Sequence, residues 1–231
     1  MTSGTLPETQ VRAMFDRIAG VYDRMNSVMT AGMHHHWRAR AVDLAEVRPG
    51  DRALDVACGT GDLAVELRRR GARVVGLDFS EPMLELARLK DPEIDWVQGN
   101  ALELPYADGE FQAVTVGFGA RNFSDLGRGI AELARVTAPG GRVVILEITT
   151  PQNPPLSWFF RLWFDRAVPA LGRLAGDPDA YTYLPLSVRR FPAPRELAAE
   201  LAGTGLERVR WVLTAGGIIA IHVGRRPEGA S

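Results

Sequence analysis

The chain has 231 residues, of which 46% are hydrophobic and 24% charged, enough for one well-buried domain and too few for two full ones. The net charge of −1 gives no general attraction to nucleic acid or to an acidic membrane surface. The single cysteine, Cys58, excludes an internal disulfide and a cysteine-ligated metal cluster. We therefore expect one cytoplasmic domain over residues 1–231, at most peripheral at the inner face of a membrane.

Residues 8–48 are predicted to form a helical cover over one face of the domain. Hydrophobic residues recur at three- and four-residue steps over residues 8–29, which predicts an amphipathic helix with a weak point at Gly20. A second helix is expected from the histidine run His34–His36 to Leu44. Three histidines suggest a metal site, but adjacent side chains on a helix point about 100° apart and cannot converge on one ion. We expect no metal.

A strand, a tight loop and a helix start follow one another in Ala53–Asp62, ALDVACGTGD. The glycines of Gly59-Thr60-Gly61 let the backbone pass close to a ligand, and the first amides of the next helix carry a partial positive charge. Asp78 ends the following apolar run, where its carboxylate can accept both hydroxyls of a ribose. Together these features predict a cofactor that contains adenosine.

Two acids distinguish between the cofactors that such a loop can hold. The spacing also satisfies the looser dinucleotide fingerprint, so an NAD(P)-dependent oxidoreductase is one alternative. Asp55, four residues before the first glycine, suits an amino-acid ammonium reached through ordered water but is unwelcome beside a pyrophosphate. Asp62 at the helix start gives the same indication. The pattern therefore favours S-adenosyl-L-methionine (SAM).

The rest of the chain predicts an α/β fold with a mostly parallel sheet. Further strands are expected over residues 73–78, 94–99, 111–119, 142–149, 206–214 and 218–224, and further helices over 62–70, from 80, over 124–138 and over 194–202. Only Ala215-Gly216-Gly217 joins the last two strands, so they must form an antiparallel hairpin. That ending is typical of the Rossmann-like class I SAM-dependent methyltransferases, whereas the dinucleotide fold ends with its strands parallel.

Residues 150–192 break this alternation. Five aromatic residues lie within the seven positions Trp158–Phe164, more than one face of a surface helix can bury. The segment is either a core-forming insert or a lid over an apolar substrate, placed where the open ends of the fourth and fifth strands would deliver it.

Eight motifs are distributed along most of the chain: FDRIAGVYDRMN at 15–26, GMHHHWR at 32–38, DVACGTGD at 55–62, GLDFSEPML at 76–84, GNALELPY at 99–106, GFGARNF at 117–123, YTYLPLSV at 181–188 and LTAGGIIAIH at 213–222. With them the sequence resembles the ubiquinone/menaquinone biosynthesis C-methyltransferases. The glycine loop is shared by all related methyltransferases, whereas the segments at 118–123, 181–184 and 213–217 are more specific. Cys58 stands where the family often has a small residue, and we interpret it as tolerated and not nucleophilic.

The resemblance implies a set of residues around the cofactor, and the glycine-loop pattern described above adds Asp55, Gly59 and Gly61. The set is Asp55, Gly59, Thr60, Gly61, Asp78, Asn100, Ala101 and Gly117. Asn100 follows the third strand, where its amide or the N–H of Ala101 can meet the adenine edge; an ordinary Asx turn is the alternative.

The resemblance also implies the acceptor, a reduced demethylated polyprenyl quinone such as demethylmenaquinol. Its ring carbon is a poor nucleophile until the adjacent hydroxyl loses its proton. Arg121 is the first candidate to hold the oxyanion or to order a water, with a structural ion pair as the alternative. Tyr22 and Tyr181 are second candidates, with packing as the alternative. His222, within an apolar strand, is expected to be a satisfied core histidine.

Three points stay open in the sequence. The acceptor is a naphthoquinol or a benzoquinol, because the motifs are silent where those rings differ. A non-catalytic SAM-binding or lipid-binding subunit is a further class, and the oligomeric state, a homo-oligomer included, is not encoded in any motif. We expect the segment Trp158–Phe164 to guide the isoprenoid tail of the quinol and to let the protein rest on a bilayer.

Overall fold

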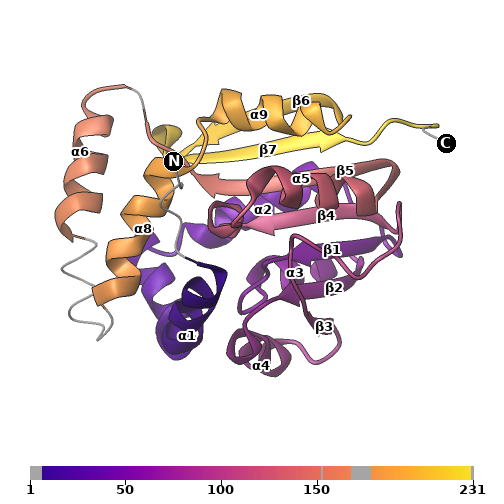
Figure 1. Ribbon diagram of the computed structural model, residues 1–231, viewed down its shortest axis with the longest axis horizontal. Helices are drawn as coiled ribbons and strands as arrows, with labels where there is room; N and C mark the ends of the chain where they lie inside the picture. The colour runs from indigo at the N-terminus through magenta and orange to yellow at the C-terminus, as the bar shows by residue number, and fades with distance from the viewer. Residues whose placement is uncertain (1–6, 152, 168–177, 230–231) are drawn as a thin grey trace.

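The structure, a computed structural model, describes residues 7–151, 153–167 and 178–229 (Figure 1). A seven-stranded sheet lies at its centre, with the strand order β3-β2-β1-β4-β5-β7-β6. The strands are β1 Arg52–Val56, β2 Arg73–Asp78, β3 Asp95–Gln98, β4 Phe111–Gly117, β5 Thr137–Ile148, β6 Glu207–Thr214 and β7 Ile219–Arg225. β1 to β5 pair in parallel, and β7 pairs antiparallel with both β5 and β6. The predicted α/β fold with its antiparallel hairpin is confirmed.

Helices pack around this sheet. They are α1 Glu8–Thr30, α2 His34–Ala45, α3 Asp62–Arg69, α4 Glu81–Lys90, α5 Leu126–Val136, α6 Leu156–Leu162, α8 Pro178–Arg190 and α9 Pro194–Gly203, and α6 continues into the π-helical turn Trp163–Ala167. α1 passes through Gly20, the predicted weak point, without a break. The buried face of α1 stabilises the helix through packing, which outweighs the low helix propensity of one glycine.

The fifth strand begins earlier than its pattern predicts. The helix expected to reach residue 138 ends at Val136, and β5 already begins at Thr137. Gly140 has a φ of +75°, and the pairing register with β4 shifts across this stretch. Pro139-Gly140-Gly141, which falls between the predicted helix and the predicted strand, is therefore a bulge inside a longer strand, which a glycine with positive φ permits.

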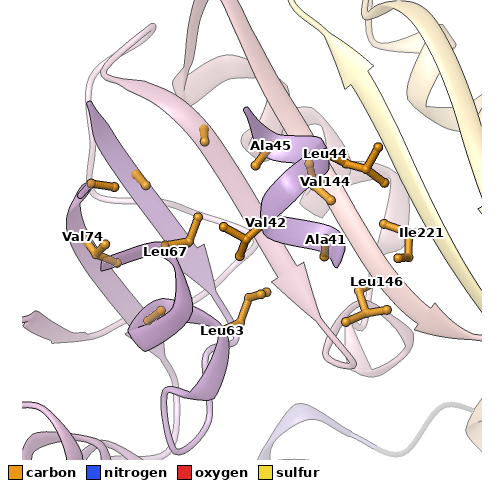
Figure 2. Close-up of a cluster of buried hydrophobic side chains, with 14 of the residues drawn as sticks. Ala41, Val42, Leu44, Ala45, Leu63, Leu67, Val74, Val144, Leu146 and Ile221 are labelled. Atoms are coloured by element: carbon orange, nitrogen blue, oxygen red, sulfur yellow. The ribbon is translucent and has the colours of Figure 1, made fainter. Parts of the chain in front are cut away.

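Side chains that alternate along the strands build a core on each face of the sheet. Ala53 belongs to the cluster under α2 and α3, and its neighbour Leu54 belongs to the cluster under α5 and α9. Figure 2 shows the first cluster, where Val42 of α2 and Leu67 of α3 approach each other above the strands. Within the described ranges, no helix has the length and hydropathy needed to cross a membrane.

The carboxyl ends of the parallel strands meet at one edge of the sheet. In Figure 1 the arrowheads of β4 and β5 point toward α1, α6 and α8. α2 packs on a face of the sheet, as expected of the helical cover, whereas α1 contacts the loops at this edge through Glu8 and Tyr22. In open α/β sheets, ligands bind at this edge, beyond the strand ends.

Candidate functional site

Two adjoining cavities lie at the carboxyl edge of the sheet. The loop cavity, of about 70 Å³, is lined by the segments that follow β1, β2, β3 and β4. The helix cavity, of about 420 Å³, is enclosed by α1, α2, α6 and α8 together with the end of β5. Five residues line both cavities and form the seam between them: Phe15, Tyr22, Arg38, Phe118 and Asn122. A group held in one cavity can therefore reach a group held in the other.

The glycine loop folds tightly at the floor of the loop cavity. Gly59 and Gly61 have φ values of +55° and +84°, in the region that side chains rarely adopt. A Cβ on Gly61 would lie 2.3 Å from Cη2 of Trp96, and a Cβ on Gly76 would lie 2.3 Å from Cζ3 of the same ring. The indole of Trp96 thus lies against two bare glycines, which explains why the loop requires glycine at position 61.

Two buried carboxylates face the loop cavity from the ends of β1 and β2. Asp55 is 1% exposed, its Oδ1 accepts a 2.8 Å hydrogen bond from Thr115, and its Oδ2 has no partner among the described residues. Asp78 accepts hydrogen bonds from the N–H groups of Gly59, at 2.7 Å, and Ser80, at 2.9 Å. Burial raises the pKa of Asp55 to about 7 and that of Asp78 to about 6. A cationic ligand would favour the ionised form of both.

Of the other predicted cofactor residues, all but Gly61 line the loop cavity: Gly59, Thr60, Asn100, Ala101 and Gly117. Two of these, Thr60 and Asn100, already have hydrogen-bond partners. The Asn100 carbonyl accepts the N–H of Leu102 at 2.9 Å, so the alternative Asx turn is present, and its amide donates to Glu8 at 2.8 Å. The Thr60 hydroxyl donates to Asp23 of α1 at 2.6 Å. The backbones of Ala101 and Gly117 line the cavity directly.

Acidic side chains of α1 close the loop cavity from above. Glu8 binds Asn100 and Asp23 binds Thr60, while Asp16 accepts a 2.5 Å hydrogen bond from the Ser80 hydroxyl. The remaining volume, about 70 Å³, holds only a few water molecules. The chemistry of the lining suits an adenosine-containing cation, but such a ligand has room only if these α1 side chains withdraw.

A chain of polar contacts connects α1, α2, α3 and α4 beside the loop. Arg38 donates to Nδ1 of His34 and lies 3.5 Å from Asp62, whose other oxygen is 2.5 Å from Nζ of Lys90. Nε2 of His34 lies 3.2 Å from the Ser27 hydroxyl. Burial, and then the charge of Arg38, lowers the pKa of His34 to about 4, so this imidazole is neutral. Sequence reasoning assigned no role to Arg38 or Lys90.

The histidine run is closer to a metal-site geometry than predicted. The ring centroids of His34 and His35 are 3.9 Å apart, and with Asp62 they offer ligand atoms within 4.8 Å of one another. The prediction that adjacent histidines must diverge is wrong, because the long side chains turn back toward each other. Two cations, Arg38 and Lys90, already contact this group. A divalent ion would have to displace them.

Apolar side chains dominate the helix cavity. α1 contributes methionines and aromatic rings, and the segment after β5 contributes Phe159, Phe160, Trp163 and Phe164. The rings of Phe160 and Phe164 stack with centroids 4.2 Å apart. Trp158, in contrast, is 62% exposed and does not line the cavity. The aromatic segment is therefore divided between a cavity wall and an outer surface.

Arg121 lies in the wall of the helix cavity and forms the buried ion pair that was its alternative role. Its Nη1 donates to Glu147 at 2.7 Å and also to the carbonyl of Phe118. Both charged side chains are buried. The Nε–H of Arg121 is buried without a hydrogen-bond partner in the described part of the chain. One donor of this guanidinium thus remains available.

The tyrosines occupy three different positions. Tyr22 lies at the seam, with its ring edge near Gly59. Tyr181 belongs to α8, but its side chain lies outside the described residues. Tyr183, which sequence reasoning missed, is buried and lines the helix cavity, and burial raises the pKa of its phenol. The i, i+4 pair Tyr183 and Ser187 marks the buried face of α8 and could have identified it.

Two further residues behave much as their patterns predict. His222 is buried, its Nε2 lies 2.9 Å from the carbonyl of Pro194, and burial lowers its pKa. Its Nδ1 has no partner among the described residues, so the prediction of a satisfied histidine holds for one nitrogen only. Burial raises the pKa of the Cys58 thiol well above its usual value, which makes it a poor nucleophile.

Comparison with known proteins gives consistent results. The model of the ubiE/COQ5 methyltransferase family matches residues 4–226. The chain is 48% identical to the demethylmenaquinone methyltransferase of Thermus thermophilus, over 93% of this chain and 100% of that one. It is 41% identical to the 2-phytyl-1,4-naphtoquinone methyltransferase of Thermosynechococcus vestitus, over 94% and 100%.

Solved structures share the fold at low sequence identity. The [4+2]-cyclase SpnF matches 97% of this chain and 98% of its own, with a TM-score of 0.73 and 18% identity. A SAM-dependent methyltransferase from Thermotoga maritima matches 93% and 99%, with a TM-score of 0.67 and 18% identity. At this identity the similarity defines the fold alone.

Proposed function

The chain belongs to the ubiE/COQ5 methyltransferase family, and we propose that it uses SAM to methylate a ring carbon of a reduced polyprenyl quinone. The acceptor is demethylmenaquinol, and the product is menaquinol. The family match over residues 4–226 excludes the NAD(P)-dependent oxidoreductase that the loop spacing had left open.

The observation that carries this proposal is the pair of cavities that share one seam. The loop cavity has the glycine loop and four acids, Glu8, Asp55, Asp62 and Asp78, around a space for a cationic ligand. The helix cavity is apolar and about six times larger in volume, 420 Å³ against 70 Å³, which suits a lipophilic ring and the start of its tail. Methyl transfer requires the two ligands to meet, and the seam is where they can.

The residues of the loop cavity fit SAM. Asp78 is placed for the ribose, Asn100 and Ala101 for the adenine edge, and Asp55, with its unpaired Oδ2, for the ammonium. When bound, SAM supplies an electrophilic methyl group. The chain itself contributes position, because the loop and the seam fix where that group faces the acceptor.

Around the acceptor, the polar groups of the helix cavity control one hydroxyl. Arg121 stabilises the oxyanion through its unpaired Nε–H, while Glu147 keeps the guanidinium in place. Tyr22 positions the ring at the seam. Tyr181 remains a second candidate from the sequence, and Tyr183, whose raised pKa keeps its phenol protonated, is a hydrogen-bond donor in the same cavity. Transfer of the methyl group to the ring carbon would break the S–CH₃ bond of SAM and leave S-adenosylhomocysteine, and the proton displaced from that carbon would pass to water.

Two observations favour a naphthoquinol over a benzoquinol. The relatives with 48% and 41% identity are named for demethylmenaquinone and for a phytyl naphthoquinone. Both matches cover the whole length of those relatives. The benzoquinol of the ubiquinone pathway is the second acceptor to test.

Contact with a membrane surface follows from the same acceptor, because its tail must leave the cavity. Trp158, Phe159 and Leu162 of α6 are 62%, 53% and 41% exposed, which supports contact between α6 and lipid. Sedimentation with lipid vesicles should decrease in W158S/F159S. Equal sedimentation of the variant and the parent protein would contradict this contact.

Turnover with paired acceptors tests the proposed function. The protein is incubated with methyl-labelled SAM and either reduced demethylmenaquinone or the reduced demethylated benzoquinone, and the lipid extract is analysed by mass. We expect a gain of one methyl group, faster on the naphthoquinol. If neither acceptor gains a labelled methyl group while the protein still binds SAM, the proposed activity is contradicted. The chain would then be a SAM-binding subunit without this activity.

A further inference from the structure

The loop cavity holds an uneven set of charges. The described residues that line it include four acids, and Arg38 is the one cation among them. SAM, the cofactor of the proposed function, carries a sulfonium, an ammonium and a carboxylate. The acids suit the first two groups, whereas a buried carboxylate requires a cation or several donors. We propose that Arg38 binds the carboxylate at the methionine end of SAM.

The position of Arg38 matches the methionine end. Its side chain reaches from α2 to the start of α3, where it lies 3.5 Å from Asp62, directly after the glycine loop. The guanidinium carbon is 5.5 Å from the centroid of the Phe118 ring, and both residues belong to the seam. In SAM the methionine end is bonded to the sulfonium, whose methyl group must face the acceptor. A side chain that binds the methionine carboxylate must therefore lie between the glycine loop and the acceptor.

The guanidinium of Arg38 retains donors for a ligand. It has five N–H groups, and its polar contacts with the described residues are one hydrogen bond to His34 and the 3.5 Å approach to Asp62. Asp62 is held more closely by Lys90, at 2.5 Å from its other oxygen. The Arg38 side chain is only 8% exposed, so little water competes for its charge. The planar guanidinium can bind both carboxylate oxygens at once.

His34 is a positioning residue for Arg38. Its Nδ1 accepts a hydrogen from Arg38, and its Nε2 lies against Ser27. The imidazole is neutral, so it fixes the orientation of the guanidinium without neutralising it. This division of roles leaves the charge of Arg38 for the ligand.

Other groups nearby are less suited to a carboxylate. The Thr60 hydroxyl donates to Asp23, so it points toward another acid. Arg121 lines only the helix cavity, and Glu147 neutralises it at 2.7 Å. Lys90, which contacts Thr60 and Asp62 beside the loop, does not line the cavity. Among the described residues that line the loop cavity, Arg38 therefore provides the counter-charge.

Binding of full and truncated ligands tests this assignment. S-adenosylhomocysteine keeps the carboxylate, whereas 5′-methylthioadenosine lacks the whole amino-acid end. Calorimetric titration of R38Q should show affinity for S-adenosylhomocysteine reduced about 10- to 100-fold, with affinity for 5′-methylthioadenosine unchanged. R38K, which keeps the charge but lacks the planar guanidinium, should show a smaller loss of affinity for S-adenosylhomocysteine than R38Q. R142Q is the matched control, because Arg142 also contacts α2, at the carbonyl of Leu44, away from both cavities.

A second measurement does not depend on the folding of a variant. The unaltered protein should bind decarboxylated SAM about 10- to 100-fold more weakly than SAM. Equal affinity for these two ligands would overturn the assignment, as would equal losses for both ligands in R38Q. Unchanged S-adenosylhomocysteine affinity in R38Q with slower methyl transfer would also overturn it and place Arg38 at the acceptor. These binding results are independent of which quinol is methylated, so failure of the proposed function is seen separately.

Discussion

Gly61 illustrates how a single residue shapes the cofactor loop. Its φ of +84° and the 2.3 Å approach of Trp96 both exclude a side chain. We expect G61A to lower the free energy of unfolding by about 2 to 4 kcal/mol, through backbone strain and overpacking, and to weaken SAM binding. G20A is the control, because nothing lies within 4 Å of that position in α1, and it should stabilise by about 0.5 to 1 kcal/mol. Denaturant unfolding of both variants measures these changes in the free energy of unfolding. Equal changes in G61A and G20A would contradict the role of Gly61.

Asp55 makes the stability of the ligand-free protein depend on pH. Burial raises its pKa to about 7 from an unfolded value near 3.8. The folded state therefore keeps a proton that the unfolded state has lost, and the contribution of this group decreases as pH rises from about 4 to 7. D55N should become more stable than the parent protein by about 2 to 4 kcal/mol across that window, with no further change above it. A pH-independent difference in unfolding free energy would contradict the buried ionisation.

Residue positions were predictable where a strand end defined them. Asp55 and Asp78 end apolar runs, and parallel strands bring such ends together, so both reach the loop cavity as expected. Arg38 and Tyr183 were not identified, because their roles depend on how α2 and α8 approach the strand ends. The i, i+4 pair Tyr183 and Ser187 marks a buried face of α8, but it does not encode which element that face approaches. Arg121 shows a different limit: its position at the strand end was predicted, but its buried partner Glu147 was not.

At the scale of elements, α1 lies over the loop cavity. Glu8 and Asp16 hold it to Asn100 and Ser80 through hydrogen bonds of 2.8 Å and 2.5 Å. Loss of both contacts should favour the open position of α1 and raise the association rate of SAM about tenfold. Stopped-flow fluorescence of E8A/D16A tests this, with R12A on the exposed side of α1 as control. An unchanged association rate in E8A/D16A would mean that α1 does not limit entry.

The aromatic segment after β5 should determine how well the acceptor tail is held. Trp163 and Phe164 line the helix cavity, whereas Trp158 is mostly exposed. We expect W163S/F164S to lose about tenfold or more in kcat/KM on acceptors with a long tail, because about 1 to 3 kcal/mol of apolar contact is lost per ring. Activity on tail-less analogues should fall less. W158S is the control in this steady-state assay, and equal losses on both kinds of acceptor would exclude a tail-binding role.

Predictability also differed between elements. The hairpin of β6 and β7 followed from a three-residue connection that permits no crossover. The role of residues 150–192 could not be predicted from the sequence, because aromatic residues without a clear period fit a core insert and a cavity wall equally well. Phe160 and Phe164 form part of the wall of the helix cavity, whereas Trp158 is exposed and lies outside that cavity. The bulge in β5 was not predicted for a similar reason, because the sequence Pro139-Gly140-Gly141 is typical of a turn.

At the scale of the whole molecule, the strand order determines where the two ligands meet. β1 and β4 are neighbours in the sheet, and the chain leaves them in opposite directions, from β1 toward β2 and from β4 toward β5. This reversal opens a crevice between their carboxyl ends. The loop cavity lies in this crevice and adjoins the helix cavity. Helices α1, α6 and α8, which line the helix cavity, lie beyond the ends of β4 and β5 (Figure 1). An enzyme that joins a charged cofactor to a lipophilic ring needs two such environments side by side.

The position of the transferred methyl group tests the central claim most directly. The protein is incubated with SAM labelled with ¹³C in the methyl group and reduced demethylmenaquinone, and the extracted product is oxidised and examined by NMR. We expect the labelled carbon on the quinone ring, since a ring carbon is the nucleophile. A labelled O-methyl ether, which cannot be oxidised back to the quinone, or an unlabelled acceptor would contradict C-methylation of the quinol.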